Sequence, residues 1–456
     1  MQTSLSRFFA KKIYDFIDLT QENIITIPDV QINETIEVET VQVQCKENGK
    51  KKRQCPFYKK IPGTSFTMDA FTYGEIPGCT AYFLSHFHAD HYGGLRKSFK
   101  HKLYCSEITA NLIKLKIGVS SNHIVALPMN TPITVQDVEV ILIDANLCPG
   151  GAVFLFKVPR NVHNTTFSSY RIPNKELNIV HTGDFRAHPS MLHKMPMQVD
   201  YLFLDTTYLN PKHTFPSQGE IIQRIGNIVF EAVFNLGKDC NFIRPSKRKK
   251  ENPTNQCTLS FGQGIKTREA AAISPFRITP DDKILIAIGS YTIGKEKIAL
   301  YLAELLECKI YLNPSKTAIW KCFDSLRINE FISDDIDSQV HVLKMNEINY
   351  SSLARHLSIT SYTKIIGIMP TGWTFGEDSW APTSVSETVC IYSIPYSEHS
   401  SYNELKDFTS RSNATKVHPT VNMSRVEEQM DYIKSWKKDE SPWIVENDMF
   451  NGKSIV

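Results

Sequence analysis

The stretch that decides the fold is His86-Phe87-His88-Ala89-Asp90-His91, which places three imidazoles and one carboxylate within six residues. The apolar run 81–84 leads into it, and two glycines close it. This order predicts a strand that delivers ligands to a loop at its carboxyl end, where α/β proteins place their chemistry. In extended backbone, His86 and His88 point to the same face. Imidazole and carboxylate together suit zinc, and two metals about 3.5–4 Å apart would suit hydrolysis of a phosphodiester.

Length and composition set the general class of the protein. At 456 residues, one large domain or two closely joined domains are expected. A formal net charge of +3 neither favours nor excludes a polyanionic partner. Ten cysteines without a CxxC pair, and no signal-peptide pattern, predict a reducing intracellular compartment. The chain has no apolar stretch of membrane-spanning length, so we expect no membrane partner.

Two compact basic runs, 50–53 and 247–250, lie in polar surroundings. Such runs are typical of nuclear import signals or nucleic-acid contacts, although a solvated loop explains either one alone equally well. The second run lies in a segment, 244–282, with little apolar periodicity. This segment is predicted to be a basic surface insertion, and the protein is expected in the nucleus.

The amino-terminal residues carry a separate signal. On one helical turn Leu5, Phe8 and Phe9 fall on the same side, beside the polar Gln2. The pattern is similar to the peptide by which replication and repair proteins dock on the PCNA sliding clamp, and it predicts clamp binding through residues 2–9. A helix that packs on its own domain is the alternative. The polar segment up to residue 54 favours the clamp.

From residue 55 onward, short apolar runs alternate with helical segments. Many short strands, each ending in turn residues, predict a two-sheet sandwich flanked by helices. Two of these strands are followed by an aspartate, Asp184 or Asp205. Asp184 is predicted to bridge two metals, and Asp205 to be a ligand or to orient one, although each alone could be a turn or cap residue. The predicted strands are 103–105, 138–143, 153–156, 178–180 and 201–204.

Several motifs together carry a family resemblance. The histidine cluster, the segment 182–185 and the segment 204–208 resemble the metallo-β-lactamase fold. Segments 289–297, 370–373, 395–402 and 419–422 are similar to the β-CASP nucleases of DNA cross-link repair, in the same order along the chain. The resemblance implies an α/β protein, a metallo-β-lactamase αββα sandwich with an inserted β-CASP α/β cap. The implied division is a flexible segment 1–54, core 55–207, cap 208–390, and returning core with tail 391–456.

The same resemblance implies a metal-dependent 5′-to-3′ DNA exonuclease that acts on 5′-phosphorylated ends in the repair of interstrand cross-links. Zinc is the implied cofactor and cross-linked DNA the implied substrate. The first metal would be held by His86, His88 and Asp184, and the second by Asp90, His91 and His399, with Asp184 bridging.

The resemblance also implies roles in catalysis and substrate binding. Asp90 would accept a proton from water, and Asp205 and His399 match the first two β-CASP motifs. The candidates for a pocket that binds the 5′ phosphate are Ser290, Ser397 and Ser400, each of which could equally cap a helix or turn.

One position departs from the family. Where the family has a ligand histidine between asparagine and cysteine, this chain has Leu147, which cannot bind a metal. The first site would then have a position open for water or for Cys148. An active enzyme and a catalytically weakened, clamp-bound DNA-binding protein both remain open, and the other ligand positions favour activity.

Two further features concern the nucleic acid. Val421 stands where the RNA-directed branch of the family has histidine, which favours DNA over an RNA-processing nuclease. Tyr208 and Trp373 are candidates to stack on bases, with core packing as the alternative.

Overall fold

The computed structural model describes residues 54–436 apart from 165, 169, 171, 235–277, 280, 324–325 and 373–379. The predicted clamp peptide at 2–9, both basic runs and Trp373 lie outside the described residues, as does nearly all of the predicted insertion 244–282. No helix in the described part of the chain has the length and apolar character needed to cross a membrane.

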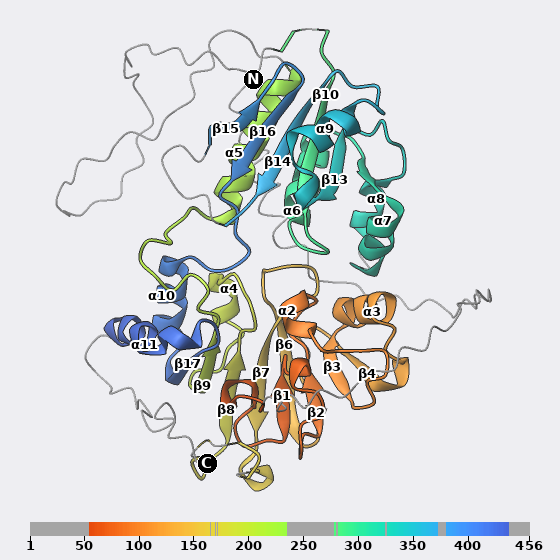
Figure 1. Ribbon diagram of the computed structural model, residues 1–456. Coiled ribbons are helices and arrows are strands. Elements are labelled where there is room, and N and C mark those ends of the chain that lie inside the picture. Colours follow the sequence, from red (N-terminus) through yellow and green to blue (C-terminus); the bar gives the residue numbers. More distant parts are fainter. Residues whose placement is uncertain are drawn as a thin grey trace, which may run out of the picture. The chain divides into compact units, whose positions relative to one another are not determined.

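Two β-sheets form the first of the layered parts of the fold (Figure 1). The smaller sheet is parallel, in the order β1-β2-β3-β4, and the larger has the order β17-β9-β8-β7-β6-β5. In the larger sheet β5 to β8 are antiparallel, whereas β8, β9 and β17 are parallel. The strands are β1 (Phe66–Met68), β2 (Ala81–Phe83), β3 (Leu103–Ser106), β4 (Ile124–Leu127), β5 (Ile133–Val135), β6 (Val138–Asp144), β7 (Ala152–Val158), β8 (Leu177–His181), β9 (Val199–Leu204) and β17 (Ala414–Pro419).

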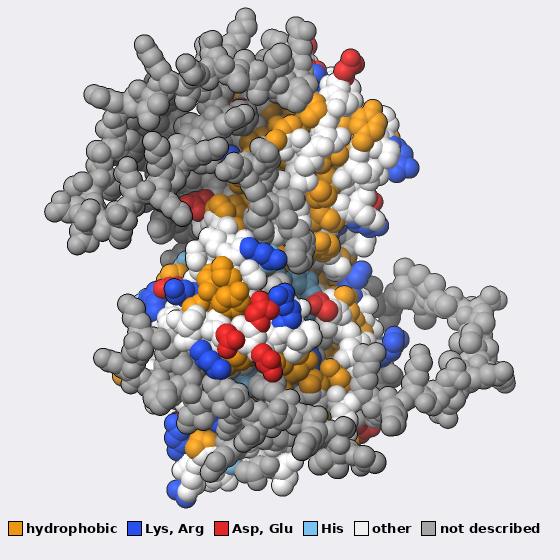
Figure 2. Space-filling model, turned by 60° about the vertical axis from the view of Figure 1, so that its left-hand side comes forward, with side chains coloured by type: hydrophobic (Ala, Val, Ile, Leu, Met, Phe, Trp, Pro, Cys, Tyr) orange, Lys and Arg blue, Asp and Glu red, His pale blue; other side chains and the backbone are white. Residues whose placement is uncertain are grey.

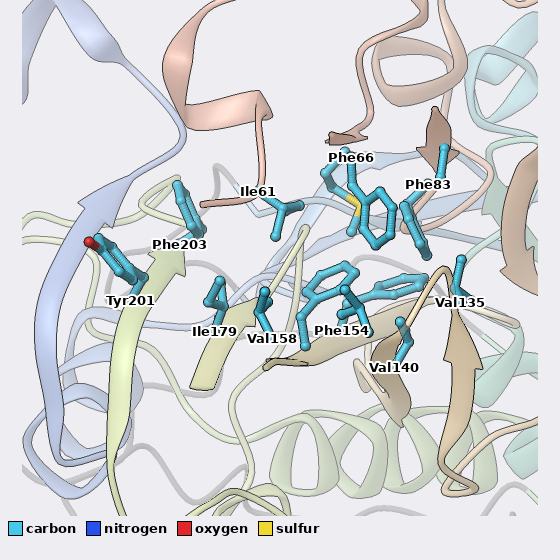
Figure 3. Close-up of a cluster of buried hydrophobic side chains, with 14 of the residues drawn as sticks. Ile61, Phe66, Phe83, Val135, Val140, Phe154, Val158, Ile179, Tyr201 and Phe203 are labelled. Carbon is cyan, nitrogen blue, oxygen red and sulfur yellow. The ribbon is translucent and has the colours of Figure 1, made fainter. Parts of the chain in front are cut away.

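Aromatic side chains from both sheets fill the space between them (Figure 3). Phe83 of β2 meets Phe154 and Phe156 of β7 edge-on, with ring centroids 5.7 and 5.2 Å apart. Phe154 and Phe156 are alternate residues of one strand, so they point to the same face. The predicted two-sheet sandwich is therefore confirmed, and so are all five predicted strands, each present with its ends shifted by at most two residues.

Helices cover the outer faces of this sandwich. Helix α3 (Glu107–Lys116) packs on β3 and β4, and α11 (Val426–Ser435) packs on β17. The Ser106 hydroxyl accepts a hydrogen bond from the Thr109 N–H and so caps α3. The remaining helices of this part are α2 (Ala89–Tyr92), α4 (Pro189–Leu192) and α10 (Tyr402–Arg411), with 3-10 turns η1 (Phe57–Lys59), η2 (Phe71–Tyr73), η3 (Ser121–His123), η4 (Arg160–Val162) and η7 (Met423–Arg425).

A third sheet is built from the chain between β9 and β17. Its order is β12-β11-β13-β10-β14-β16-β15, parallel except for β15. The strands are β10 (Ile284–Ser290), β11 (Ile310–Leu312), β12 (Ile332–Ser333), β13 (Val340–Lys344), β14 (Lys364–Pro370), β15 (Pro382–Val385) and β16 (Val389–Ile394). The helices are α5 (Gln218–Phe234), α6 (Glu296–Leu305), α7 (Pro314–Trp320), α8 (Leu326–Phe331) and α9 (Tyr350–Leu357), with η5 (Lys321–Phe323) and η6 (Met345–Glu347).

Both faces of this third sheet are covered, since every residue of β10 is buried. Leu353 and Leu357 of α9 join Leu285 and Ala287 of β10 in one apolar cluster. The alternate residues of β10 face the other side, where α5 and α6 lie. The predicted cap limit at residue 390 falls inside β16, so we propose that the cap ends after Ile394.

The surface carries charges of both signs. On the face seen in Figure 2, lysine and arginine side chains are interspersed with aspartate and glutamate, and several areas are hydrophobic. This mixture agrees with the formal net charge of only +3.

Candidate metal centre

The histidine motif lies where β2 leaves the smaller sheet. His86 is buried, His88 is the N-cap residue of the short helix α2, and His91 lies in the last turn of that helix. The turn brings His91 back toward His86, with ring centroids 4.1 Å apart. His86 Nε2 lies 2.9 Å from His88 Nδ1, so the two side chains lie on the same side of the backbone, as the sequence predicts.

Asp184 lies at the centre of the cluster. Its Oδ2 atom is 3.1 Å from His91 Nε2, 3.8 Å from His86 Nε2 and 3.9 Å from His399 Nε2. Gly183 makes this approach possible, because its φ is +55° and a Cβ there would lie 2.6 Å from Ser85 Cβ. Imidazole nitrogens from the histidine motif and from the distant His399 thus converge on one carboxylate oxygen.

His399 arrives from the segment that follows β16. The Ser397 hydroxyl accepts from the His399 N–H at 2.9 Å, which fixes this turn. Helix α10 begins directly afterwards, with a capping box between Ser401 and Glu404. The backbone around His399 is therefore held on both sides.

Buried carboxylates stand behind two of the histidines. His91 Nδ1 donates to Asp69 Oδ2 at 2.7 Å, and His399 Nδ1 donates to Asp205 Oδ2 at 2.8 Å. Both aspartates are nearly inaccessible, at 4% and 1% exposure. Each pair leaves the histidine Nε2 directed at Asp184, which is the arrangement that orients metal-binding histidines. For Asp205 this geometry favours the orienting role over direct binding.

Sequence reasoning missed Asp69. It follows β1 directly, as Asp184 and Asp205 follow the ends of β8 and β9, so the same strand-then-aspartate pattern was available as a signal. Asp69 also accepts from the Ser85 N–H at 2.8 Å and from the Ser85 hydroxyl at 2.7 Å. The Ser85 hydroxyl lies 2.9 Å from His86 Nδ1, so Asp69 reaches His86 through Ser85.

The metal-free cluster divides into neutral and charged histidines. Burial, followed by the neighbouring histidines, holds the pKa of His86 well below its usual value, and burial also lowers the pKa of His88. Burial would lower the pKa of His91 too, but Asp184 and Asp69 together outweigh it and raise that pKa well above the usual value. For His399 the carboxylates of Asp205 and Asp184 likewise outweigh burial and raise the pKa to about 9.

This donor set fits divalent metals. Two overlapping groups have ligand atoms within 4.8 Å of one another: His86, His91 and Asp184 form one, and Asp184, Asp205 and His399 form the other. Imidazole nitrogen and carboxylate oxygen are zinc ligands, and a shared carboxylate can serve two ions. Asp90 lies on the solvent side, with a side chain 78% exposed and an oxygen 3.6 Å from His91 Nε2.

Leu147, the residue that departs from the family pattern, is buried, with 3% of its surface exposed. Its neighbour Cys148 is also buried, and burial, followed by nearby carboxylates, raises the pKa of the thiol well above its usual value. Cys148 belongs to neither of the two ligand groups found among the described residues.

The three predicted phosphate-binding hydroxyls are buried and bound to backbone atoms. Ser290 Oγ lies 2.9 Å from the Gly294 carbonyl oxygen, Ser397 Oγ lies 3.0 Å from the His399 carbonyl oxygen, and Ser400 donates to the Phe185 carbonyl at 2.9 Å. Ser397 and Ser400 do flank His399. Their role in binding phosphate stays a prediction.

Tyr208 is only 4% exposed and packs its ring against Phe215 and His213, so it offers no face to a base. The stacking prediction for Tyr208 is wrong, and core packing is the correct alternative. Val421 lies next to the site, since its carbonyl accepts from the Thr206 hydroxyl at 3.0 Å.

Comparison with known proteins identifies the family. A model described as "DNA repair metallo-beta-lactamase" matches residues 325–425, and one described as "Beta-lactamase superfamily domain" matches residues 62–232. This chain belongs to the DNA repair metallo-β-lactamase family. The fold of this family implies divalent metals, in agreement with the clusters around Asp184.

Curated relatives agree with this assignment. The chain is 39% identical to the DNA cross-link repair 1A protein of Mus musculus, over 85% of this chain and 33% of the relative. It is 36% identical to the DNA cross-link repair protein SNM1 of Arabidopsis thaliana, over 81% and 66%. It is 26% identical to the 5′ exonuclease Apollo of Gallus gallus, over 79% and 63%. The chain spans about a third of the length of the vertebrate 1A relatives that it matches.

Proposed function

We propose that this protein is a metal-dependent 5′-to-3′ DNA exonuclease that acts on 5′-phosphorylated ends in interstrand cross-link repair. The observation that carries the proposal is the convergence of His86, His91 and His399 on one oxygen of Asp184. The names of the DNA cross-link repair relatives support DNA as the substrate, and the name of the 5′ exonuclease Apollo supports attack from the 5′ end.

Divalent metals, with zinc as the favoured ion, would supply Lewis acidity toward the phosphate and lower the pKa of water. His86, His88 and Asp184 would hold one ion, and Asp90, His91 and His399 the other, with Asp184 shared. Asp69 and Asp205 would keep His91 and His399 in the tautomer that leaves Nε2 free.

The remaining residues would handle the proton and the strand. Asp90 stands at the solvent side of the cluster, where its carboxylate can accept the proton of the attacking water. Attack at phosphorus would release a 5′-phosphorylated nucleotide from the end of the strand. Binding of DNA should weaken as salt rises, since phosphate contacts release counterions.

The test uses single-stranded DNA with a 5′ phosphate and a 3′ label, incubated with zinc, manganese or magnesium. The protein should shorten the strand stepwise from the 5′ end, and Asp90→Asn should abolish this. Asp431→Asn is the matched control, because that side chain on α11 is equally exposed, at 79%. RNA of the same sequence should stay intact.

Other outcomes would overturn the proposal. Shortening from the 3′ end, or full activity of Asp90→Asn, contradicts it. No digestion by the natural chain, with digestion restored by Leu147→His, would instead establish the weakened DNA-binding protein.

Two further parts of the proposal concern location and partners. Residues 2–9 would bind the PCNA sliding clamp, which a pull-down with Phe8→Ala and Phe9→Ala as negative variants tests directly. The action of the relatives in DNA repair supports a nuclear location.

A further inference from the structure

Tyr291 is an exposed aromatic residue on a fixed piece of backbone. It follows β10 directly, and its side chain is 60% exposed. The Lys316 ammonium donates to the Tyr291 carbonyl, and to the Thr292 carbonyl at 3.0 Å. Lys316 is itself buried, so the chain at Tyr291 is anchored from below while the ring faces solvent.

The loop that carries Tyr291 is joined to the metal centre through Glu398. Lys295 binds the Glu398 carboxylate with its backbone N–H at 2.8 Å and with its ammonium at 3.3 Å. Gly294, with φ of +103°, lets the loop come this close, because a Cβ there would lie 2.7 Å from Glu398 Oε2. Glu398 immediately precedes His399, so Tyr291 stands beside the metal-binding segment.

Tyr208, the other tyrosine considered for stacking, packs against the same metal-binding segment. The ring of Tyr208 lies 6.1 Å from that of His399. Of these two tyrosines, only Tyr291 has a ring that is accessible to solvent.

The two faces of the Tyr291 ring differ. The Lys295 ammonium lies over the ring at 5.3 Å from its centroid, and Lys295 is only 7% exposed. One face is thus occupied by a buried cation, which favours an electron-rich partner on the other face. A nucleobase offers such a π-face whatever its sequence.

We propose that Tyr291 stacks on a base near the 5′ end of the single strand and so positions that strand at the metal centre. This inference rests on the proposed function, because it needs a DNA strand at Asp184. It moves the stacking role from the buried Tyr208 to a residue with an accessible face.

The experiment measures binding of a 3′-labelled, 5′-phosphorylated oligodeoxynucleotide by fluorescence anisotropy, with zinc present and Asp90→Asn as the background so that the strand is not cut. The set contains Tyr291→Ala and Tyr291→Phe. Each protein is tested with intact DNA and with strands that lack one base at the first, second, third or fourth position.

The control is Phe234→Ala, another exposed aromatic, at 50%. Phe234 ends helix α5, whose first residue, Gln218, donates to the Ser397 carbonyl at 3.1 Å. Phe234 lies roughly 24 Å farther along the helix axis. Its loss should leave binding unchanged.

Tyr291→Ala should weaken binding of intact DNA about 5- to 100-fold, whereas Tyr291→Phe should stay within about twofold of the parent. Removal of the one base that stacks on Tyr291 should weaken DNA binding by the parent protein by a similar factor. The same removal should not weaken DNA binding by Tyr291→Ala any further. The inference is overturned if Tyr291→Ala binds DNA as tightly as the parent does. It is also overturned if loss of a base, at every position tested, lowers the DNA affinity of both proteins equally.

The two proposals fail separately. If the natural chain does not digest DNA but the abasic and Tyr291→Ala effects coincide, the exonuclease is wrong and the stacking holds. If digestion occurs and the effects are additive, only the stacking is wrong. In active protein, Tyr291→Ala should raise KM more than it lowers kcat.

Discussion

The two proposed halves of the candidate metal centre, His86 with His88 and His91 with His399, would share Asp184 but are built differently. On the side of His91 and His399, each imidazole donates to a buried carboxylate, Asp69 or Asp205. On the side of His86 and His88, the outer partner of His86 is the Ser85 hydroxyl, and His88 Nε2 has no hydrogen-bond partner in the described part of the chain.

Leu147, the position at which the sequence departs from the family pattern, concerns the half with His86 and His88. In the proposed assignment, the half with His91 and His399 would also have Asp90, which gives it four donors when Asp184 is included. The half with His86 and His88 would have three donors, because Leu147 stands where the family resemblance implies a fourth. The half whose histidines donate to buried carboxylates is also the half with the full proposed set of donors, and we expect that half to bind metal more tightly.

The largest expected effect comes from the residue common to both halves. Asp184→Asn keeps the shape of the side chain but removes the charge that the two ions would share. We expect kcat/KM of the DNA digestion to fall about 1000-fold, together with loss of both metal ions in elemental analysis. Activity within tenfold of the natural chain would show that neither half depends on this carboxylate.

The pH dependence should separate the halves. His399 has a pKa of about 9 in the metal-free protein, so at pH 7 it is protonated and must release that proton to bind metal. Metal affinity of this half should rise by at least about tenfold per pH unit from pH 7 to 9, because His91, whose pKa is also raised, must release a proton as well. The His86 and His88 half, with lowered pKa values, should change little in this range.

The stability of the metal-free protein should depend on pH in the opposite direction to its metal affinity. Because the pKa of His399 is higher in the folded than in the unfolded state, its protonation stabilises the metal-free protein below about pH 6.5. This stabilisation is lost as pH rises through about 9.

Calorimetric titration with zinc in buffers of different ionisation enthalpy counts the protons released by each half. Equal proton release from both halves would contradict the expected difference between them.

The buried carboxylates give the next effect. Asp69→Asn and Asp205→Asn should each lower metal affinity 10- to 100-fold, on the His91 and His399 half first, because the histidine loses its charged partner. Asp200→Asn is the matched control. Asp200 is also buried, at 5%, and accepts from the Asn178 N–H at 2.8 Å, but it lies near the start of β9, away from the site.

The smallest effect should come from adding a donor to the half with His86 and His88. Leu147→His would restore a fourth donor and raise the metal affinity of the His86 and His88 half about tenfold, measured by competition with a chelator. Leu147→Met conserves volume without offering imidazole and should leave the affinity unchanged. If both substitutions act alike, the missing donor does not explain the weakness.

The sequence predicted the local parts of this architecture well. The histidine motif is short, so its own backbone determines that His86 and His88 face each other. The strands were evident because apolar runs with turn residues at their ends are local signals. Asp184 could be placed because it follows a strand, although only family resemblance pointed to His399.

The remainder depended on contacts between distant segments. Whether the hydroxyls of Ser290 and Ser397 are available depends on carbonyl groups that fold back over them. Tyr208 and Tyr291 are both tyrosines that follow strands, yet one is 4% and the other 60% exposed. That difference arises from how Phe215 and His213 pack on Tyr208, which no local pattern reports.

The most direct measurement is anomalous X-ray scattering at the zinc edge from crystals of the zinc-loaded protein. We predict two peaks about 3.5–4 Å apart on either side of the Asp184 carboxylate, with the higher occupancy beside His91 and His399. Absence of zinc from this cluster, or a stronger peak beside His86 and His88, would contradict the account.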